Sequence, residues 1–213
     1  MTILQALFLG LVQGLTEYLP VSSSAHLVLV PSVLGWQFSE QEAFIFDVLV
    51  QLGTLVGVLV YFSDSIRRVV CSVIEGLLAR DPLRDSDARL GWMVALATIP
   101  AAVIGLLFKA QLAAYFSSPL AACYCLILTG IIMIAAERLS KVYQRPVSSI
   151  DALSIGFAQS LALLPGVSRS GSTIAAGMAR GFSRAEAARF SFLMSIPVMI
   201  GASLVASVDL MRD

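Results

Sequence analysis

The sequence predicts an all-α, polytopic membrane protein with an inverted-topology repeat, in which two re-entrant helical hairpins meet near the bilayer midplane. Three observations support this fold. Of the 213 residues, 58% are hydrophobic and only 13% are charged, whereas about 25% of the residues of an average soluble protein are charged. The apolar residues form runs that approach the roughly 20 residues needed to cross a bilayer. Finally, residues 5–26 resemble residues 151–173 without a gap.

The repeat is visible when the first stretch is shifted by 146 positions, so that QALFLGLVQGLTEYLPVSSSAH aligns with DALSIGFAQSLALLPGVSRSGST. Only the first copy carries Glu17 and His26, and only the second carries Arg169. This division predicts one site assembled from two related halves. The identical pairs include Gly10 with Gly156, Gln13 with Gln159, Val21 with Val167, Ser22 with Ser168, and Ser24 with Ser170.

The first apolar segment, residues 3–19, is a helix candidate that ends at Pro20 and the serines that follow it. Proline has no N–H for the helix ladder, and serine side chains compete for local backbone groups. The next apolar run, residues 25–34, is too short to span a bilayer. Residues 3–35 are therefore expected to form a re-entrant hairpin. Irregular backbone at membrane depth occurs inside protein or beside a water-filled cavity, so the hairpin marks a functional site.

The remaining chain alternates long apolar segments with polar connections. Full spans are expected at residues 43–62, 91–108, 120–137 and 190–208, with a kink at Pro100 in the second. A short apolar helix is expected within the polar stretch 63–90, polar or short connections at 109–119 and 138–149, a second re-entrant hairpin at 151–180, and an amphipathic connection at 182–188.

Basic residues orient these segments. Residues 1–41 contain no Lys or Arg, and the stretch 109–119 contains only Lys109. The positive-inside rule places the Lys- and Arg-rich connections in the cytoplasm. Three spans separate the hairpins, so the hairpins enter from opposite faces, as in an inverted repeat. The cytoplasmic set is Arg67, Arg68, Arg80, Arg84, Arg89, Arg138, Lys141, Arg145, Arg180, Arg184 and Arg189.

We expect one integral membrane domain over residues 1–213, with repeat 1 at 1–145 and repeat 2 at 146–213. Repeat 2 holds one span where repeat 1 holds three, so about two spans are expected to be missing from it. The N-terminus shows no removable signal peptide. The zero net charge gives no argument for a nucleic-acid partner. The three cysteines lack metal-type spacing and are expected to be structural thiols (Cys71, Cys123 and Cys125).

The polar residues of the two hairpins suit a phosphate ligand. Arg169 can bind phosphate oxygens bidentately, and serines and a threonine lead into a helix start, where free N–H groups favour anions. Glu17 can hold a divalent cation. Ser23, His26 or water could attack phosphorus, with His26 as an assisting base.

Plainer readings exist for each of these residues. Glu17 could reach the membrane surface, a lone histidine is often structural, and serine turns commonly cap helices. An arginine at a hairpin tip requires a partner or a ligand, which favours the functional reading. Asp47 and Gln51 suit a cavity lining or an interhelical hydrogen bond equally well, and Glu137 suits an interfacial anchor.

The stretches QGLTEYLPVSSSAH and PGVSRSGST resemble the two signatures of the bacitracin-resistance family of undecaprenyl-pyrophosphate phosphatases. The resemblance extends along essentially the whole chain, including FDVLVQLG and FSFLMSIP. It implies a hydrolase of the bacterial cytoplasmic (inner) membrane that converts undecaprenyl (C55) diphosphate into undecaprenyl phosphate and inorganic phosphate. Such an enzyme recycles the lipid carrier of peptidoglycan synthesis, confers bacitracin resistance, and uses a divalent cation, Mg²⁺ or Ca²⁺.

Matched position by position, the resemblance implies catalytic roles for Glu17, Ser23, His26 and Arg169, with Glu17 also as metal ligand. Where the family has either an acid or an amide, this chain has Gln13, which weakens any model that needs two acids for the metal. The implied substrate-binding residues are Gln13, Ser22, Ser168, Ser170 and Thr173.

Two other classes of membrane protein share features with this chain. Inverted repeats with broken helices are also typical of transporters, so a transporter or flippase of a polyprenyl phosphate lipid is the alternative. The type-2 phosphatidic acid phosphatases need two histidines, and this chain has only His26. The first hairpin enters from the non-cytoplasmic face, so we expect the site to be reached from the periplasmic or outer side. The expected partners are undecaprenyl diphosphate and the lipid bilayer, and homo-oligomerisation stays open.

Overall fold

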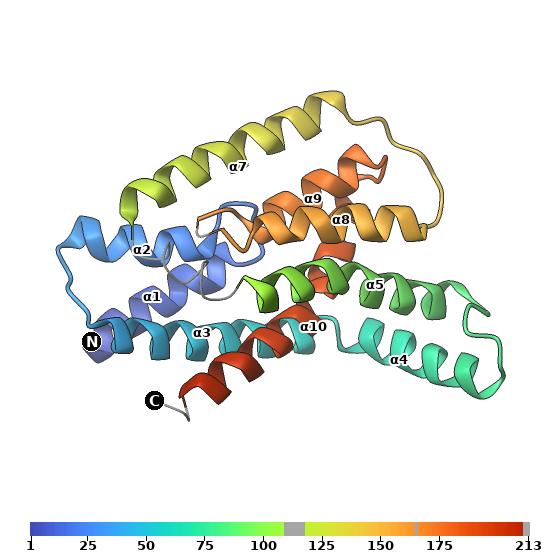
Figure 1. Cartoon of the computed structure of the whole chain (residues 1–213), viewed down its shortest axis with the longest axis horizontal. Coiled ribbons are helices and arrows are strands. Elements are labelled where there is room, and N and C mark those ends of the chain that lie inside the picture. The colour runs from blue at the N-terminus through green and yellow to red at the C-terminus, as the bar shows by residue number, and fades with distance from the viewer. Residues whose placement is uncertain (109–117, 165, 211–213) are drawn as a thin grey trace.

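A computed structural model describes residues 1–108, 118–164 and 166–210, and the regular elements of this described part are all α-helices (Figure 1). The predicted all-α class is confirmed. Most of the predicted connection 109–119, including Lys109, lies outside the described residues, as does Pro165. The helices are α1 (Ile3–Thr16), α2 (Ser23–Leu34), α3 (Glu40–Tyr61), α4 (Ser63–Leu78), α5 (Ser86–Leu107), α7 (Pro119–Leu139), α8 (Ser149–Leu161), α9 (Arg169–Ala179) and α10 (Arg184–Leu210).

Four described helices are long and apolar enough to cross a membrane, which agrees with the four predicted spans. They are α3, α5, α7 and the Arg184–Ala206 part of α10. The stretch predicted as a separate amphipathic connection, 182–188, joins α10 from Arg184 onward. A reciprocal cap starts this helix, because Ser183 Oγ accepts from the Glu186 N–H at 3.3 Å while the Glu186 carboxylate accepts from the Ser183 N–H at 2.9 Å.

Helices α1 and α2 form one hairpin and helices α8 and α9 form another, and in Figure 1 the two turns face each other near the middle of the molecule. The turns are built alike. Ser22 Oγ accepts from the Ala25 N–H, as Ser168 Oγ does from the Gly171 N–H. Each capping serine also contacts the serine two residues on, at 3.2 Å for Ser22 and 3.1 Å for Ser168. The aligned serines of the repeat therefore perform the same local task.

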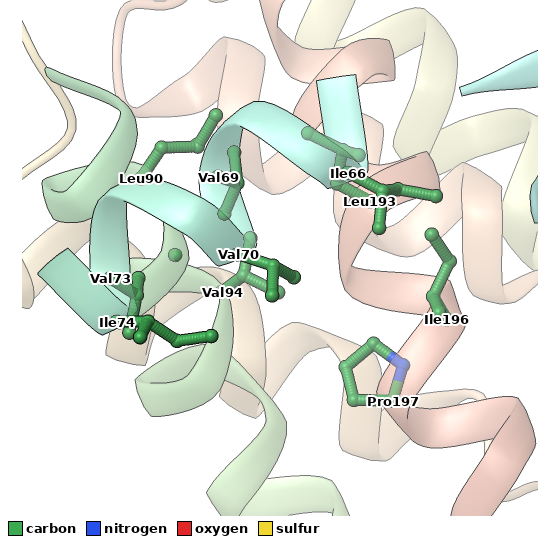
Figure 2. Close-up of a pocket in the computed structure, with 11 residues that line it drawn as sticks. Ile66, Val69, Val70, Val73, Ile74, Leu90, Val94, Leu193, Ile196 and Pro197 are labelled. Atoms are coloured by element: carbon green, nitrogen blue, oxygen red, sulfur yellow. The ribbon is translucent and has the colours of Figure 1, made fainter. Parts of the chain in front are cut away.

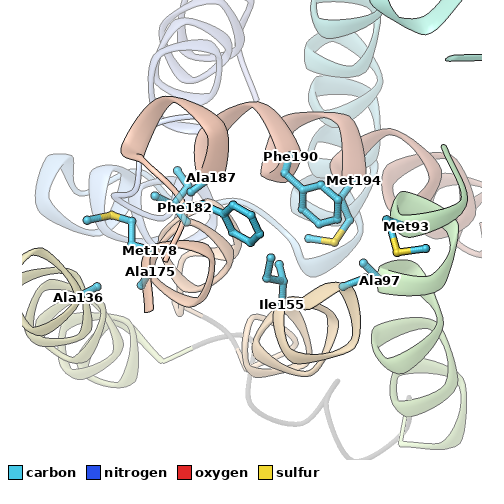
Figure 3. Packing of buried hydrophobic residues seen from close by; sticks show 12 residues of the cluster. Met93, Ala97, Ala136, Ile155, Ala175, Met178, Phe182, Ala187, Phe190 and Met194 are labelled. Carbon is cyan, nitrogen blue, oxygen red and sulfur yellow. The ribbon is translucent and has the colours of Figure 1, made fainter. Parts of the chain in front are cut away.

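The main hydrophobic core surrounds the second hairpin (Figure 3). Helix α5 packs against α8, and helices α7 and α10 pack against α9. Gly156 makes the first contact possible, because a Cβ there would lie 2.3 Å from the Ala97 carbonyl oxygen. The fully or nearly buried members of the core include Met93, Ala97, Ala152, Ile155, Ala175, Met178, Phe182, Phe190 and Met194.

A buried carboxylate fixes the open end of the second hairpin. Asp151 is fully buried at the start of α8 and accepts hydrogen bonds from both Arg145 and Arg180, the latter at 2.6 Å from Nε. Arg145 also donates to the Arg180 carbonyl at 2.8 Å and lies over the ring of Phe182. This cluster ties the segment before α8 to the end of α9.

Replacement of Asp151 by asparagine is expected to lower the free energy of unfolding by roughly 3 kcal/mol, since it removes the charge that pairs two arginines. The Arg145 guanidinium holds the pKa of the Asp151 carboxyl well below its usual range. The folded pKa lies below the unfolded value of about 4, so this stabilisation is present above pH 4 and is lost as the pH falls further.

Thermal unfolding in detergent from pH 3 to 7 should show the wild-type curve converging on that of Asp151→Asn at acid pH. Asp64→Asn, at an exposed position of α4, is the control, and equal stability of Asp151→Asn and wild type at pH 7 would contradict the prediction.

Candidate functional site

The turns of the two hairpins meet at an ion pair between Glu17 and Arg169. Arg169 Nη2 donates to Glu17 Oε1 at 2.7 Å, across 152 residues of sequence. Both side chains are largely buried, with 15% of Arg169 and 10% of Glu17 exposed. A second link is the hydrogen bond from Ser170 Oγ to the Leu19 carbonyl, at 2.8 Å. Glu17 and Arg169, two of the three residues that distinguish the copies of the repeat, are thus in direct contact.

The other oxygen of the Glu17 carboxylate organises the first hairpin. Glu17 Oε2 accepts from Ser23 Oγ at 2.5 Å and from Gln13 Nε2 at 2.8 Å. Gln13 is almost fully buried, one turn before Glu17 on α1. One carboxylate therefore contacts three other residues of the predicted site, Gln13, Ser23 and Arg169.

The serine turn that carries Ser23 contains a strained residue. Ser22 has φ 57° and ψ 97°, a backbone conformation that a residue with a Cβ rarely adopts. Ser22 is buried, and its hydroxyl caps α2. The strained turn places the next residue, Ser23, against the carboxylate of Glu17.

His26 was predicted to assist Ser23 as a base, but it contacts the backbone of Ser22 instead. Its Nδ1 lies 2.7 Å from the Ser22 carbonyl oxygen, and a carbonyl can only accept, so Nδ1 carries a proton. In the neutral ring Nε2 is then an acceptor. Within the described residues, the partner of the Ser23 hydroxyl is Glu17 and not His26.

The polar residues at the start of α9 are engaged in the fold. Ser168 Oγ caps the helix, and the Ser168 N–H donates to Thr129 Oγ1 at 3.2 Å. Thr173 Oγ1 donates to the Arg169 carbonyl at 2.8 Å and lies 2.6 Å from Ser191 Oγ. These side chains hold Arg169 in position, and Ser168 Oγ already accepts from one of the first N–H groups of α9, that of Gly171.

The family model of the bacitracin resistance protein BacA matches residues 6–213 of this chain. The chain belongs to this family. It is 44% identical over 213 residues to the undecaprenyl-diphosphatase of Chloroherpeton thalassium, covering 96% of this chain and 74% of the relative. It is 45% identical to the undecaprenyl-diphosphatase of Pelodictyon phaeoclathratiforme, with the same coverage. The undecaprenyl-diphosphatase 2 of Stutzerimonas stutzeri is 44% identical over 100% of this chain and 78% of its own length. The family resemblance predicted from the two signatures is confirmed.

Two residues around Arg169 in this BacA family protein were not predicted. The Arg169 guanidinium lies over the ring of Tyr18, 5.7 Å from its centroid, and Nη2 lies 3.8 Å from the sulfur of Met199. Tyr18 OH contacts the same sulfur at 3.7 Å. Tyr18 stands beside Glu17 in the first signature, which is a usable sequence signal. Met199 reaches the site only through the packing of α10 and has none.

Asp47 and Gln51 lie on α3, and their two predicted roles, lining a cavity or forming an interhelical hydrogen bond, stay predictions. The described hydrogen bonds of the BacA family chain include none between either side chain and the Glu17 network. Glu137 pairs with Arg184 at the exposed end of α7, which suits the predicted anchor.

One cavity of the BacA family protein, about 270 Å³ in volume, lies between α4, α5 and α10 (Figure 2). Its wall is apolar throughout, so it is unsuited to phosphate. One of its lining residues, Ile196, packs against the small cluster of buried residues that contains Met199. The lining residues are Ile66, Val69, Val70, Val73, Ile74, Leu90, Gly91, Val94, Leu193, Ile196 and Pro197.

In the part of the chain that the structure describes, no three His, Cys, Asp or Glu side chains are close enough to form a metal site by themselves. The hairpin junction of this BacA family protein instead offers one carboxylate, Glu17, and a carboxamide oxygen. That oxygen, Gln13 Oε1, is buried and has no hydrogen-bond partner among the described residues. Arg169 Nη1 is likewise buried and unpaired there. The junction therefore retains one unused acceptor and one unused cationic donor.

Proposed function

We propose that this chain is a membrane phosphatase that hydrolyses undecaprenyl (C55) diphosphate to undecaprenyl phosphate and inorganic phosphate. The relatives named above are undecaprenyl-diphosphatases. The observation that carries the proposal is the Glu17 carboxylate. One of its oxygens accepts from the Ser23 hydroxyl and the other from Arg169 Nη2, while Arg169 Nη1 is unpaired among the described residues. This reaction recycles the cell-wall lipid carrier, which is consistent with the bacitracin resistance in the family's name.

Ser23 is the proposed nucleophile and Glu17 its general base. The Ser23 Oγ–H bond points to Glu17 Oε2 at 2.5 Å, so the carboxylate can take the proton as Oγ attacks the terminal phosphorus. The bond to the bridging oxygen breaks, and undecaprenyl phosphate leaves with the electron pair. Water then attacks the phosphoserine, gives up a proton, and releases inorganic phosphate as Ser23 recovers its own proton from Glu17. His26 Nε2 is the acceptor assigned to the proton of that water.

Arg169 supplies the positive charge that the phosphates need. Nη2 holds Glu17, while Nη1 is buried and free to donate to a phosphate oxygen. A charge-assisted bond in a buried site is stronger than one in water. Arginine can serve both partners at once because its donors lie in a fixed plane. The two hairpins would thus close around the headgroup through one side chain.

The junction also fits a divalent cation, Mg²⁺ or Ca²⁺. Both ions prefer oxygen ligands, and Mg²⁺ is commonly held by one or two carboxylates together with substrate phosphates. Glu17 and the unpaired Oε1 of Gln13 are the residues that would hold it. When bound, the cation supplies neutralisation of phosphate charge.

The test is phosphate release from C55 diphosphate by the purified protein in detergent, with Mg²⁺ or Ca²⁺ and with an excess of chelator. We expect release with either cation and a loss of at least tenfold with chelator. Binding of the lipid without release of phosphate would contradict the proposal and favour the transporter or flippase alternative.

The site is proposed to face the outer side of the bacterial cytoplasmic membrane, because residues 1–41 carry no Lys or Arg while the connections beyond α3 and α7 are basic. In a background with Cys71, Cys123 and Cys125 replaced by serine, Ser23→Cys should react with a small, membrane-impermeant thiol reagent added to intact cells. Ser86→Cys, in the predicted cytoplasmic stretch, should react only after lysis. The opposite pattern would reverse the assignment.

A further inference from the structure

Buried polar atoms without partners are concentrated in the two hairpins. Among the described residues, seven buried side-chain nitrogen and oxygen atoms make no hydrogen bond, and five of the seven belong to hairpin helices. Such atoms cost free energy, native proteins contain few of them, and each requires an explanation. The five are Gln13 Oε1, Gln159 Nε2, Gln159 Oε1, Arg169 Nη1 and Ser172 Oγ, and the other two are Trp92 Nε1 and Ser203 Oγ.

Gln159 is the extreme case, because neither atom of its carboxamide has a partner and the side chain is only 2% exposed. The repeat aligns it with Gln13, which donates to Glu17. The second hairpin has Leu163 at the position of Glu17, so the partner that satisfies Gln13 has no counterpart there. The Gln159 amide is therefore buried without a carboxylate to accept its hydrogen bond, unlike the amide of Gln13.

Ser172 on α9 shares this condition. Ser172 is 3% exposed and its hydroxyl is unpaired. It lies three residues after Arg169, hence on the same face of the helix, and it aligns with His26 of the first hairpin. Helices α8 and α9 pack against each other. The second hairpin therefore holds unpaired polar atoms at the positions equivalent to Gln13 and His26 of the first.

We propose that Gln159 is a further substrate-binding residue, whose Nε2 donates, together with the Ser172 hydroxyl, to phosphate oxygens of the headgroup held by Arg169. This inference rests on the proposed function. A diphosphate has more oxygen atoms than one guanidinium can bind, since a bidentate contact uses two. Neutral amide and hydroxyl donors bind the remainder without adding a second charge to a buried site. The headgroup is then bound by both hairpins, with attack from the first and retention by the second.

The deciding variant is Gln159→Leu, which has a similar volume and removes both unpaired atoms. The ligand-free variant should unfold at the same temperature as wild type or at a higher one, because no bond is lost. Its KM for C55 diphosphate should rise roughly tenfold, the loss expected for a hydrogen bond to a charged group, with a smaller change in kcat. Inorganic pyrophosphate should raise the unfolding temperature of wild type more than that of the variant. Ser172→Ala should show a weaker form of the same behaviour, and Gln144→Leu, in the exposed segment before α8, should show none of it.

A lower unfolding temperature of Gln159→Leu, or its failure to fold, would show that the carboxamide is bonded within the ligand-free protein and would overturn the inference. An unchanged KM with unchanged stabilisation by pyrophosphate would overturn it equally. Failure of the proposed function looks different, because wild type would then release no phosphate from C55 diphosphate. The comparison of pyrophosphate binding between wild type and Gln159→Leu is independent of that outcome.

Discussion

Replacement of Arg169 by lysine is expected to lower kcat/KM for C55 diphosphate at least a hundredfold in a protein that still folds. Arginine pairs with Glu17 through Nη2 and keeps Nη1 for a phosphate oxygen. A lysine ammonium is a single point charge and cannot hold both partners in the arginine geometry. A hundredfold loss corresponds to about 2.7 kcal/mol of transition-state stabilisation. The measurement is phosphate release over a range of substrate concentrations, with thermal unfolding as the check on folding.

Arg169→Ala should be more severe, because it leaves the Glu17 carboxylate buried without its counter-charge, a change that costs about 3–5 kcal/mol. The matched control is Arg184→Lys, since Arg184 is exposed and pairs with Glu137 at the end of α7. That variant should retain wild-type activity. Near-wild-type activity of Arg169→Lys would show that Arg169 contributes charge alone.

Ser23→Ala is expected to reduce kcat by about 10³-fold or more, with little change in KM. The hydroxyl is bonded to Glu17 and provides the attacking atom, so its loss removes the first chemical step rather than substrate binding. Rapid quenching with substrate labelled in the terminal phosphate should trap a phosphoenzyme in wild type and none in Ser23→Ala. The neighbouring variant Ser24→Ala is the control, because Ser24 contacts Ser22 and not Glu17.

A water nucleophile makes the contrary prediction. Ser23→Ala would then retain most of its activity, no label would be trapped, and Glu17→Gln would still be inactive. This result would leave the ion pair between Glu17 and Arg169 as the centre of the site and would reassign only the attacking group.

Local properties of the chain made much of the fold predictable. Helix breaks were expected at Pro20 and in the serine turns. The next helices begin in those turns, with Ser22 and Ser168 as caps, but α1 ends at Thr16, three residues before the predicted end. The start of α10 was placed too late, since the reciprocal cap of Ser183 and Glu186 was not recognised in a stretch whose polar composition favoured a connection.

The sequence predicted which residues belong to the site but not which of them are in contact. Glu17, Ser23 and Arg169 were all expected to contribute, but the expected helper of Ser23 was His26, and the structure places Glu17 there instead. Spacing did not decide between them, because Ser23 follows Glu17 by six residues and precedes His26 by three, and the strained backbone of Ser22 selects the former.

The sequence by itself determined the all-α membrane class, the paired hairpins and the family. Hydrophobicity, charge distribution and repeat alignment are properties of segments, and they persist whatever the segments touch. Only the tertiary structure decided that Arg169 bonds Glu17, that Tyr18 and Met199 surround it, and that Gln159 is buried without a partner. The reason is physical, since these facts depend on how α1, α8, α9 and α10 pack, and side chains 152 residues apart share no local signal.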